Sequence, residues 1–453
     1  MGKHGRDKTK PKKKEKKAKD KPVSLEDIVT EDSPKDTKVR KAKSPRQNRG
    51  TKRRRTISYE NVPIDEYTEA ELRFDKRLVK KTLFIFVLII ILVFAVTLFV
   101  NRDNLTVDNF SAWFNNSVLG ISDGKGFPVD INGTTVSNGN FRLINGKPCY
   151  ASDTSYVELS DTAGEAVNAQ LSYDNPVVRG TSNYNIVYGV GSKGYMVCSS
   201  LEQKKKSDTE TGVFSADIND KGYYAVVTEG KDYLSELSAY NSENKKIYSY
   251  MFAEYYITCV SINSRGTGAI CTGITTENGI EKTRVYVLDF STEKPVKEYE
   301  INNSVAYESF FLSSSKAILV SSDGVYSLDF ESEEPKKTEY DSSILTTYSF
   351  NPDTKSLALV LSRSGDGRNC DVVTFNSNGE KEQKIETELR IDSISTYKGT
   401  IGMLSEGQAF ILNNDGTLSE GVDAGNDAQS ILLYSNSNAY ILGISEIREV
   451  KLN

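Results

Sequence analysis

Histidine, the side chain most often used to move protons at neutral pH, is almost absent from this chain. The single histidine is His4, so everything after it lacks an imidazole. Ser-His-Asp and Cys-His systems and histidine-ligated zinc therefore cannot form in the later part of the chain. Carboxylates remain, because 48 of the 62 Asp and Glu residues follow residue 81, and two carboxylates suffice for glycoside hydrolysis. Their spacing selects no pair. We assign no catalytic, cofactor-binding or metal-binding residue and expect no cofactor.

Five cysteines could in principle form disulfides: Cys149, Cys198, Cys259, Cys271 and Cys370. Their odd number and sparse spacing are not typical of a disulfide framework. Cys259 and Cys271 flank one predicted hairpin, but a disulfide between directly paired strands would be strained. Four of the five lie in apolar strand patterns, where cysteine acts as a small core residue. We therefore expect thiols.

Two Asp-Gly pairs raise the question of a calcium site. They lie in SGDGRNCD at 364–371 and in NNDGT at 413–417. Neither has the Asp-x-Asp-x-Asp-Gly spacing of an EF-hand loop, and both fall where a hairpin turn is due. We interpret both as turns.

An uncharged run of nineteen residues, TLFIFVLIIILVFAVTLFV at 82–100, divides the chain into two unlike parts. As a helix it would span about 28 Å, close to the hydrocarbon thickness of a bilayer. Residues 1–81 contain 27 of the 57 Lys and Arg residues and only 14 acidic ones, whereas the remainder is acidic. The positive-inside rule then predicts a single-pass cell-membrane protein with residues 1–81 in the cytoplasm and the later residues outside. A cleaved signal peptide is the alternative, but the run begins too deep in the chain and no small-residue cleavage site follows it.

The polar segments on either side of this run are predicted to have separate roles. The lysine-rich tail 1–81 has too little apolar surface to fold and is expected to be disordered, with an amphipathic helix at 67–80 beside the membrane. Its lysines are interpreted first as a solvated tail that sets the topology beside an anionic leaflet. Contact of the basic tail with anionic lipid is the alternative, and nucleic acid is the less favoured partner. RRRTIS at 53–58 resembles a basophilic kinase site. Residues 101–125 are predicted to be a linker, because Asn, Ser, Asp and Gly dominate them.

Residues 126–453 have the pattern of an all-β domain, in which pairs of apolar strands enclose polar turns. The turns recur about every 43 residues, and four strands in such an interval are the period of a β-propeller blade. These turns lie near Asn219, Asn263, Ser313, Asn351, Thr396 and Ser435.

The 328 residues of this domain predict a closed β-propeller of eight four-stranded blades, with seven blades as the alternative. The last blade lacks one strand, and FPVDIN at 127–132 is expected to supply it and to close the ring. The blades are predicted to begin near Phe141, Pro176, Val213, Tyr256, Ala306, Leu345, Arg390 and Gln429.

The repeat resembles quinoprotein-like and WD40-like propellers in general layout, although the Gly-His and Trp-Asp signature of WD40 repeats is missing. The whole plan is a basic tail, one anchor and an outward propeller. It is similar to a family of single-pass proteins from clostridial Gram-positive bacteria, whose domain is one of unknown function. The resemblance covers nearly the full length and transfers no site residue.

These features predict a non-catalytic binding or scaffolding module outside the membrane, anchored in the lipid bilayer through residues 82–100. A protein or envelope partner would bind loops on one face of the ring, because the strands are engaged in their own blades. Two alternatives remain, an extracellular carbohydrate-active enzyme that uses carboxylates alone and an envelope sensor that signals by recruitment. The lack of histidine and the single tryptophan, Trp113, favour the binding module over the enzyme.

Overall fold

The computed structural model describes residues 85–89, 124–200, 202–413 and 415–452. Residues 85–89 form a helical turn with exposed side chains. Within these described ranges, no helix is long and apolar enough to cross a bilayer. The predicted tail 1–81, the rest of the predicted transmembrane helix and residues 101–123 of the linker lie outside the described residues.

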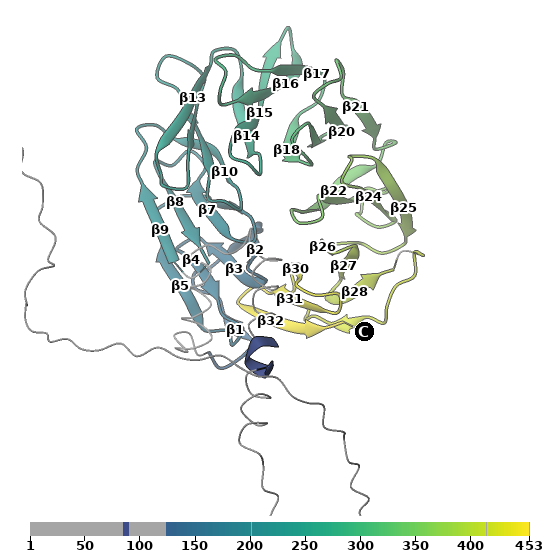
Figure 1. The fold of residues 1–453 in the computed structure, drawn as a ribbon. Helices are drawn as coiled ribbons and strands as arrows, with labels where there is room; N and C mark the ends of the chain where they lie inside the picture. Colours follow the sequence, from purple (N-terminus) through teal and green to yellow (C-terminus); the bar gives the residue numbers. More distant parts are fainter. Residues whose placement is uncertain (1–84, 90–123, 201, 414, 453) are drawn as a thin grey trace, which may run out of the picture. The chain divides into compact units, whose positions relative to one another are not determined.

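Residues 129–451 form eight antiparallel sheets of four strands, which are the blades of a propeller (Figure 1). This confirms the eight-bladed prediction, and the seven-bladed alternative is wrong. In blades 1–7 the strands follow the chain from the axis outward, so the first strand of each blade is its inner strand. Blade 8 takes its outer strand from the beginning of the domain.

The first four blades use strands of five to ten residues. Blade 1 contains β2 (Val136–Ile144), β3 (Lys147–Ser152), β4 (Ser155–Leu159) and β5 (Glu165–Gln170). Blade 2 contains β6 (Pro176–Gly180), β7 (Tyr184–Gly189), β8 (Tyr195–Ser199) and β9 (Glu202–Ser207). Blade 3 contains β10 (Val213–Ile218), β11 (Tyr224–Glu229), β12 (Ser235–Tyr240) and β13 (Lys246–Phe252). Blade 4 contains β14 (Tyr256–Ile262), β15 (Gly268–Glu277), β16 (Ile280–Asp289) and β17 (Lys297–Asn302).

Three of the last four blades end in an outer strand of four residues or fewer. Blade 5 contains β18 (Ala306–Phe311), β19 (Lys316–Ser321), β20 (Gly324–Asp329) and β21 (Lys336–Glu339). Blade 6 contains β22 (Ile344–Asn351), β23 (Ser356–Ser362), β24 (Cys370–Phe375) and β25 (Lys381–Thr387). Blade 7 contains β26 (Ser393–Tyr397), β27 (Thr400–Ser405), β28 (Gln408–Leu412) and β29 (Val422–Asp423). Blade 8 contains β30 (Ser430–Leu433), β31 (Asn438–Leu442), β32 (Glu446–Lys451) and β1 (Val129–Asp130).

Two predicted blade starts are wrong by more than one residue. Blade 1 begins at Val136 rather than Phe141, because an irregular register between these two residues interrupts the alternation of apolar side chains. Blade 7 begins at Ser393 rather than Arg390, because Arg390 lies in the preceding connection, where its Nε is 3.0 Å from Asp392 Oδ1.

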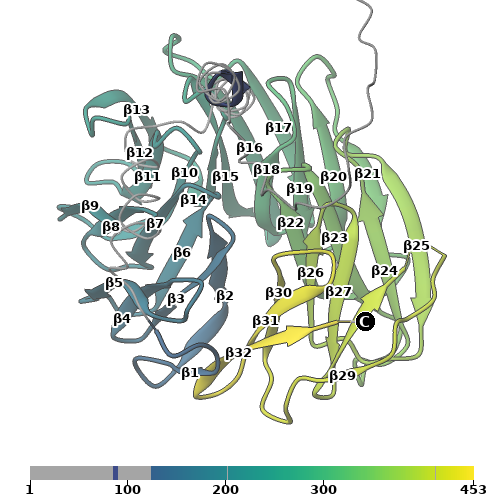
Figure 2. The ribbon, with the colours of Figure 1, turned by 60° about the horizontal axis from the view of Figure 1, so that its bottom comes forward.

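The ring is closed by a strand from the start of the domain, as FPVDIN predicted. β1 pairs with β32 in antiparallel register, with Val129 opposite Ile447 (Figure 2). The backbone N–H of Ile131 donates to the carbonyl of Ser445 at 2.8 Å and extends this pairing by one residue. The outermost position of blade 8 is thus filled from the other end of the domain, and the ring has no open seam.

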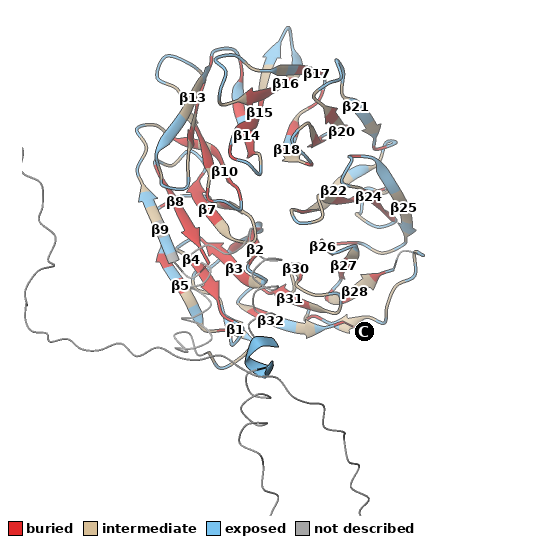
Figure 3. Ribbon diagram, viewed as in Figure 1, coloured by how far each residue is buried: buried red, intermediate tan, exposed pale blue. Residues whose placement is uncertain are grey.

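The apolar core is divided into eight clusters, one at each interface between neighbouring blades. The strand β19, with the sequence KAILVS, is apolar on both faces, and its contacts explain why. Ala317 and Leu319 pack against blade 4, whereas Ile318 and Val320 pack against blade 6. Side chains alternate along a strand, so a middle strand between two other blades buries both of its faces. Outer strands such as β13 and β25 consist almost entirely of exposed and half-buried residues (Figure 3).

Polar side chains add hydrogen bonds between neighbouring blades near the axis. The Oγ of Ser215 in β10 accepts a hydrogen bond of 3.2 Å from the backbone N–H of Val260 in β14. The Oγ of Ser395 in β26 accepts one of 2.9 Å from the N–H of Leu433 in β30. These N–H groups lie on the free edge of an inner strand, so the neighbouring blade satisfies donors that the sheet leaves unpaired.

Alternating strand direction gives the ring two distinct faces. We call the loop face the one that carries the amino-terminal ends of the inner strands and the connections between second and third strands of each blade. The turn face carries the other hairpins. The described chain reaches the ring at the turn face, where the N–H of Gly126 donates to Thr162 O at 2.9 Å. It also ends there, because the N–H of Leu452 donates to Ser437 O at 2.8 Å.

Candidate functional site

Five polar side chains from the inner strands of five blades lie near the axis of the ring. Because the inner strand is the part of each blade nearest the axis, its long side chains can reach neighbours across the ring. We call this group the axial cluster, and it consists of Arg142 on β2, Arg179 on β6, Asp217 on β10, Glu308 on β18 and Tyr348 on β22.

An ion pair crosses the ring within this cluster. The Nη1 of Arg179 in blade 2 pairs with Oε1 of Glu308 in blade 5, and the Tyr348 hydroxyl in blade 6 donates to Oε2 of Glu308 at 2.8 Å. A second contact joins blade 2 to blade 6, because the Ser182 hydroxyl donates a hydrogen bond of 3.4 Å to Oδ1 of Asp353. Blade 2 is therefore linked directly to blades on the far side of the axis.

Electrostatics hold Arg179 and Tyr348 in fixed protonation states at neutral pH. Burial is the largest single effect on Arg179 and lowers its pKa, but the Glu308 carboxylate, together with smaller contributions from neighbouring side chains, raises the pKa above its usual value. Burial, and then the negative charge of Glu308, raise the pKa of Tyr348. The phenol therefore stays protonated at neutral pH and acts as a donor.

The other two members of the cluster have weaker partners. Burial raises the pKa of Asp217 to about 6, although the N–H of Ile262, at 2.9 Å from Oδ2, opposes this rise. Burial and the neighbouring positive charge of Arg179 lower the pKa of Arg142. The cluster thus contains one closed ion pair and two charged groups with no ion pair to each other.

No member of the axial cluster was predicted from the sequence as a site residue. A signal was present, because Arg179 in VVRG and Glu308 in AYESFF are charged residues inside inner strands. What the sequence did not contain was the partner of each charge, since the two residues are 129 positions apart.

Exposed apolar side chains are concentrated on the loop face. Among the described residues of the propeller, ten large apolar side chains are exposed, and only Ile247 and Val296 of these belong to the turn face. The remaining eight form the loop-face apolar set: Val190, Tyr233, Met251, Tyr256, Ile280, Tyr307, Ile344 and Ile444.

Three members of this set occupy equivalent places in consecutive blades. Tyr256, Tyr307 and Ile344 lie at or next to the first residue of the inner strands β14, β18 and β22. Their exposed fractions are 51%, 48% and 59%. The loop-face end of the axis is therefore bordered on one side by apolar side chains, which is typical of a surface that binds another molecule.

The five cysteines are buried free thiols, as predicted. Cys259 lies opposite Thr272, and Cys271 lies opposite Val260, so the two cysteines of this hairpin are not cross-strand partners. Burial, supported by the charge of Glu308, raises the pKa of the Cys259 thiol to about 11. A thiol with such a pKa is a poor nucleophile at neutral pH.

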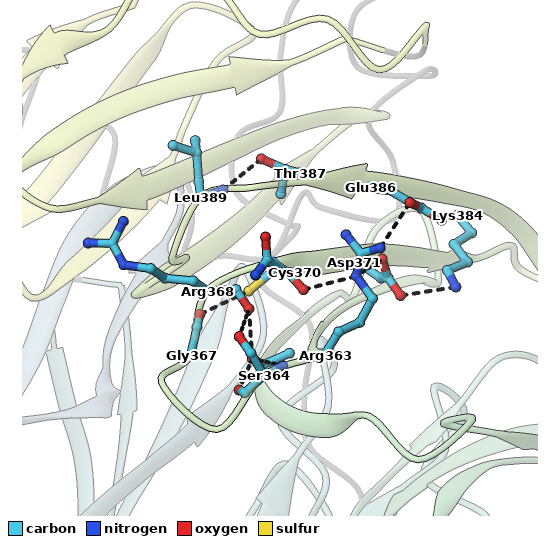
Figure 4. Close-up of polar contacts among 12 residues, drawn as sticks. Arg363, Ser364, Gly367, Arg368, Cys370, Asp371, Lys384, Glu386, Thr387 and Leu389 are labelled. Carbon is cyan, nitrogen blue, oxygen red and sulfur yellow. Dashed lines mark hydrogen bonds and ion pairs between the residues drawn. The ribbon is translucent and has the colours of Figure 1, made fainter.

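The Asp-Gly motif at 364–371 forms the predicted turn between β23 and β24. Asp366 closes this turn itself, because its Oδ1 accepts a hydrogen bond of 3.1 Å from the N–H of Arg368. Asp371, at the end of the motif, is buried between Arg363 Nε at 3.2 Å and Lys384 Nζ at 3.0 Å (Figure 4). The two carboxylates thus have separate partners and do not converge on one cation.

The second Asp-Gly motif, at 413–417, also forms a turn. The Oδ1 of Asp415 accepts a hydrogen bond of 2.9 Å from the N–H of Thr417, and Gly416 adopts a positive φ of 85°. Across the described part of the chain, no three His, Cys, Asp or Glu side chains are grouped as ligands for a metal ion.

Comparison with known proteins gives one family and several similar solved structures. A family model described as a family of unknown function (DUF5711) matches residues 129–452. No curated protein matches the sequence.

Among solved structures, the C-terminal WD40 domain of Sif2 is similar, with a TM-score of 0.51 and 9% identity over 73% of this chain and 98% of that chain. BamB from Moraxella catarrhalis gives a TM-score of 0.44 and 12% identity over 71% and 100% of the two chains. The β-propeller domain of Cps50 (Swd1) from Myceliophteria thermophila gives 0.43 and 9% over 72% and 100%. The similarity to the Sif2 domain supports the propeller fold and says nothing of function.

Proposed function

The chain belongs to the DUF5711 family of unknown function, and we propose that its propeller is a non-catalytic protein-binding module at the outer face of the cell membrane. In this proposal, residues 82–100 anchor the chain in the bilayer with the basic tail inside the cell. The partner is an envelope protein that binds the loop face.

The distribution of exposed apolar side chains carries this proposal. Scattered exposed apolar residues need no explanation, but eight of ten on one face are a biased distribution. Tyrosine is enriched among the residues that dominate protein–protein binding energy, and Tyr256 and Tyr307 border the axis side by side in sequence-adjacent blades. A partner with apolar side chains would remove this surface from water.

The point where the chain reaches the ring supports the same orientation. The described amino-terminal segment meets the propeller at the turn face through Gly126. A tether from residues 82–100 would therefore leave the loop face on the opposite side of the ring, away from the tether and accessible to a partner.

An enzyme that uses carboxylates alone is the second candidate. It is favoured by Asp217, because burial raises its pKa to about 6, in the range of a general acid or base at neutral pH. The other axial carboxylate, Glu308, is engaged by both Arg179 and Tyr348, which favours a structural role for it.

Cross-linking capture with matched variants tests the binding proposal. Ile344→Asp places a charge on the loop face, and Val296→Asp places one on the turn face at a residue of similar exposure, 55% against 59%. Full-length protein and Val296→Asp are expected to recover the same partner from membrane extracts, and Ile344→Asp is expected to lose it. Equal recovery by both variants contradicts binding through the loop face.

Two further experiments separate the remaining parts of the proposal. Protease added to intact protoplasts is expected to remove the propeller and to spare residues 1–81, and the reverse protection pattern contradicts the orientation.

Purified protein is expected not to cleave wall glycans. Cleavage that disappears in Asp217→Asn, with the fold retained, would establish the enzyme instead.

A further inference from the structure

Arg142 is the member of the axial cluster whose charge is least matched. Its one hydrogen bond runs from Nη2 to the carbonyl of Gly180 at 3.4 Å, beyond the usual range for such a bond. Among the described residues, no carboxylate oxygen lies within 4.0 Å of its guanidinium. A guanidinium carries five N–H donors, so most donors of Arg142 have no protein acceptor.

Arg142 is partly exposed, so its unpaired donors can meet water or an ion from solution. Burial and the adjacent charge of Arg179 both lower the pKa of Arg142. The second axial arginine is paired, because Arg179 contacts Glu308.

Neither carboxylate of the axial cluster forms an ion pair with Arg142. Glu308 is shared between Arg179 and Tyr348. The Oδ2 of Asp217 is held by the N–H of Ile262, which belongs to the next blade. Two arginines and two carboxylates are therefore assembled at the axis, but only one ion pair is formed.

We propose that Arg142 binds a small oxyanion, a phosphate or a carboxylate group, at the axis of the ring. The planar guanidinium presents parallel N–H donors that fit the two oxygens of such a group. Arg179 adds a second positive charge nearby, and the partial exposure of Arg142 gives an ion in solution access to it. This site goes beyond the proposed partner surface and does not depend on it, because it lies on the inner strand β2 and uses no residue of the loop-face apolar set.

Calorimetry and thermal unfolding of the purified full-length chain test the proposal. Inorganic phosphate is the first probe, with chloride at equal ionic strength as the reference. A short peptide with a free terminal carboxylate and its amidated form are the second pair. Binding of phosphate alone identifies a free inorganic ion as the ligand, and binding of the free peptide but not the amidated one identifies a carboxylate.

Three variants locate the site. Arg142→Gln is expected to weaken binding of the effective probe about tenfold or more, since hydrogen bonds to charged groups contribute about 1.5–3 kcal/mol. Arg265→Gln, which removes an exposed arginine from the turn 263–267, is expected to leave binding unchanged within about twofold. If Arg142→Gln does not fold, Arg142→Lys keeps the charge but loses the paired donors, and a weakening of several-fold is expected.

The proposal is overturned if wild-type protein binds none of the probes beyond chloride, or if the folded variants at position 142 bind as the wild type does. It is also overturned if Arg265→Gln weakens binding to the same extent as Arg142→Gln, because the effect would then be one of net charge. Capture of the loop-face partner is measured separately with the Ile344→Asp variant. The anion site and the partner surface are therefore tested independently, and failure of one does not affect the test of the other.

Discussion

Removing the closing strand is expected to destabilise the whole ring. We compare fragment 124–453 with fragment 132–453, which lacks β1 and the residues beside it. The Phe127 ring lies 5.0 Å from that of Tyr440, and Val129 and Ile131 pack in the cluster between blades 8 and 1. Three partly buried apolar side chains contribute about 1–2 kcal/mol each. The backbone hydrogen bonds of β1 to β32 contribute about 1 kcal/mol each.

The expected loss is about 5–8 kcal/mol, which is comparable to the total stability of many domains. Urea unfolding followed by circular dichroism measures this loss as a decrease in the free energy of unfolding. Val129→Ala in fragment 124–453 is the graded control and is expected to cost about 1 kcal/mol. An unchanged unfolding midpoint in fragment 132–453 would show that the ring does not depend on closure by this strand, and would refute the reasoning.

Three other predictions use the packing and the titration of single residues. Gly180→Ala is expected to destabilise the fold by about 2 kcal/mol or more, because an added Cβ would lie 2.0 Å from Asn185 Oδ1. Gly139→Ala is the control and is expected to be neutral in thermal melts, because no atom lies within 4 Å of its added Cβ. Asp217→Asn is expected to stabilise the fold by on the order of 1–3 kcal/mol above pH 6, because burial raises the pKa of the native carboxyl from 3.8 to about 6. This advantage is expected to grow from about pH 4 to pH 6 and then to level off, and a constant difference across that range in urea titrations contradicts the assignment. The five buried cysteines are expected to react with a thiol reagent only after denaturation, so rapid labelling of the native protein would disprove their burial.

Local patterns in the sequence were sufficient to predict the blades. The continuous apolar run in KAILVS and the polar turn before it are properties of a few consecutive residues, and they do not depend on what the strand packs against. The closing strand was predictable for a similar reason, since FPVDIN precedes the first blade and the last blade lacks one strand. Where local alternation is interrupted, as between Val136 and Phe141, the predicted boundary was wrong.

The predicted turns at the two Asp-Gly motifs and the predicted free thiols also follow from local features. Asp366 accepts its hydrogen bond from a residue two positions away, so its role is contained in the motif itself. Cysteines in apolar strands are buried in any packing of those strands.

The axial cluster and the loop face were decided only by the tertiary structure. Arg179 and Glu308 meet because the ring brings blades 2 and 5 to a common axis, and a repeat pattern carries no information on contacts across that axis. Tyr256, Tyr307 and Ile344 have the same place in three repeats, but their exposure depends on strand direction and on which end of each blade faces solvent. Secondary structure is determined by neighbours along the chain, whereas a site at the axis is determined by the curvature with which eight similar blades close on one another.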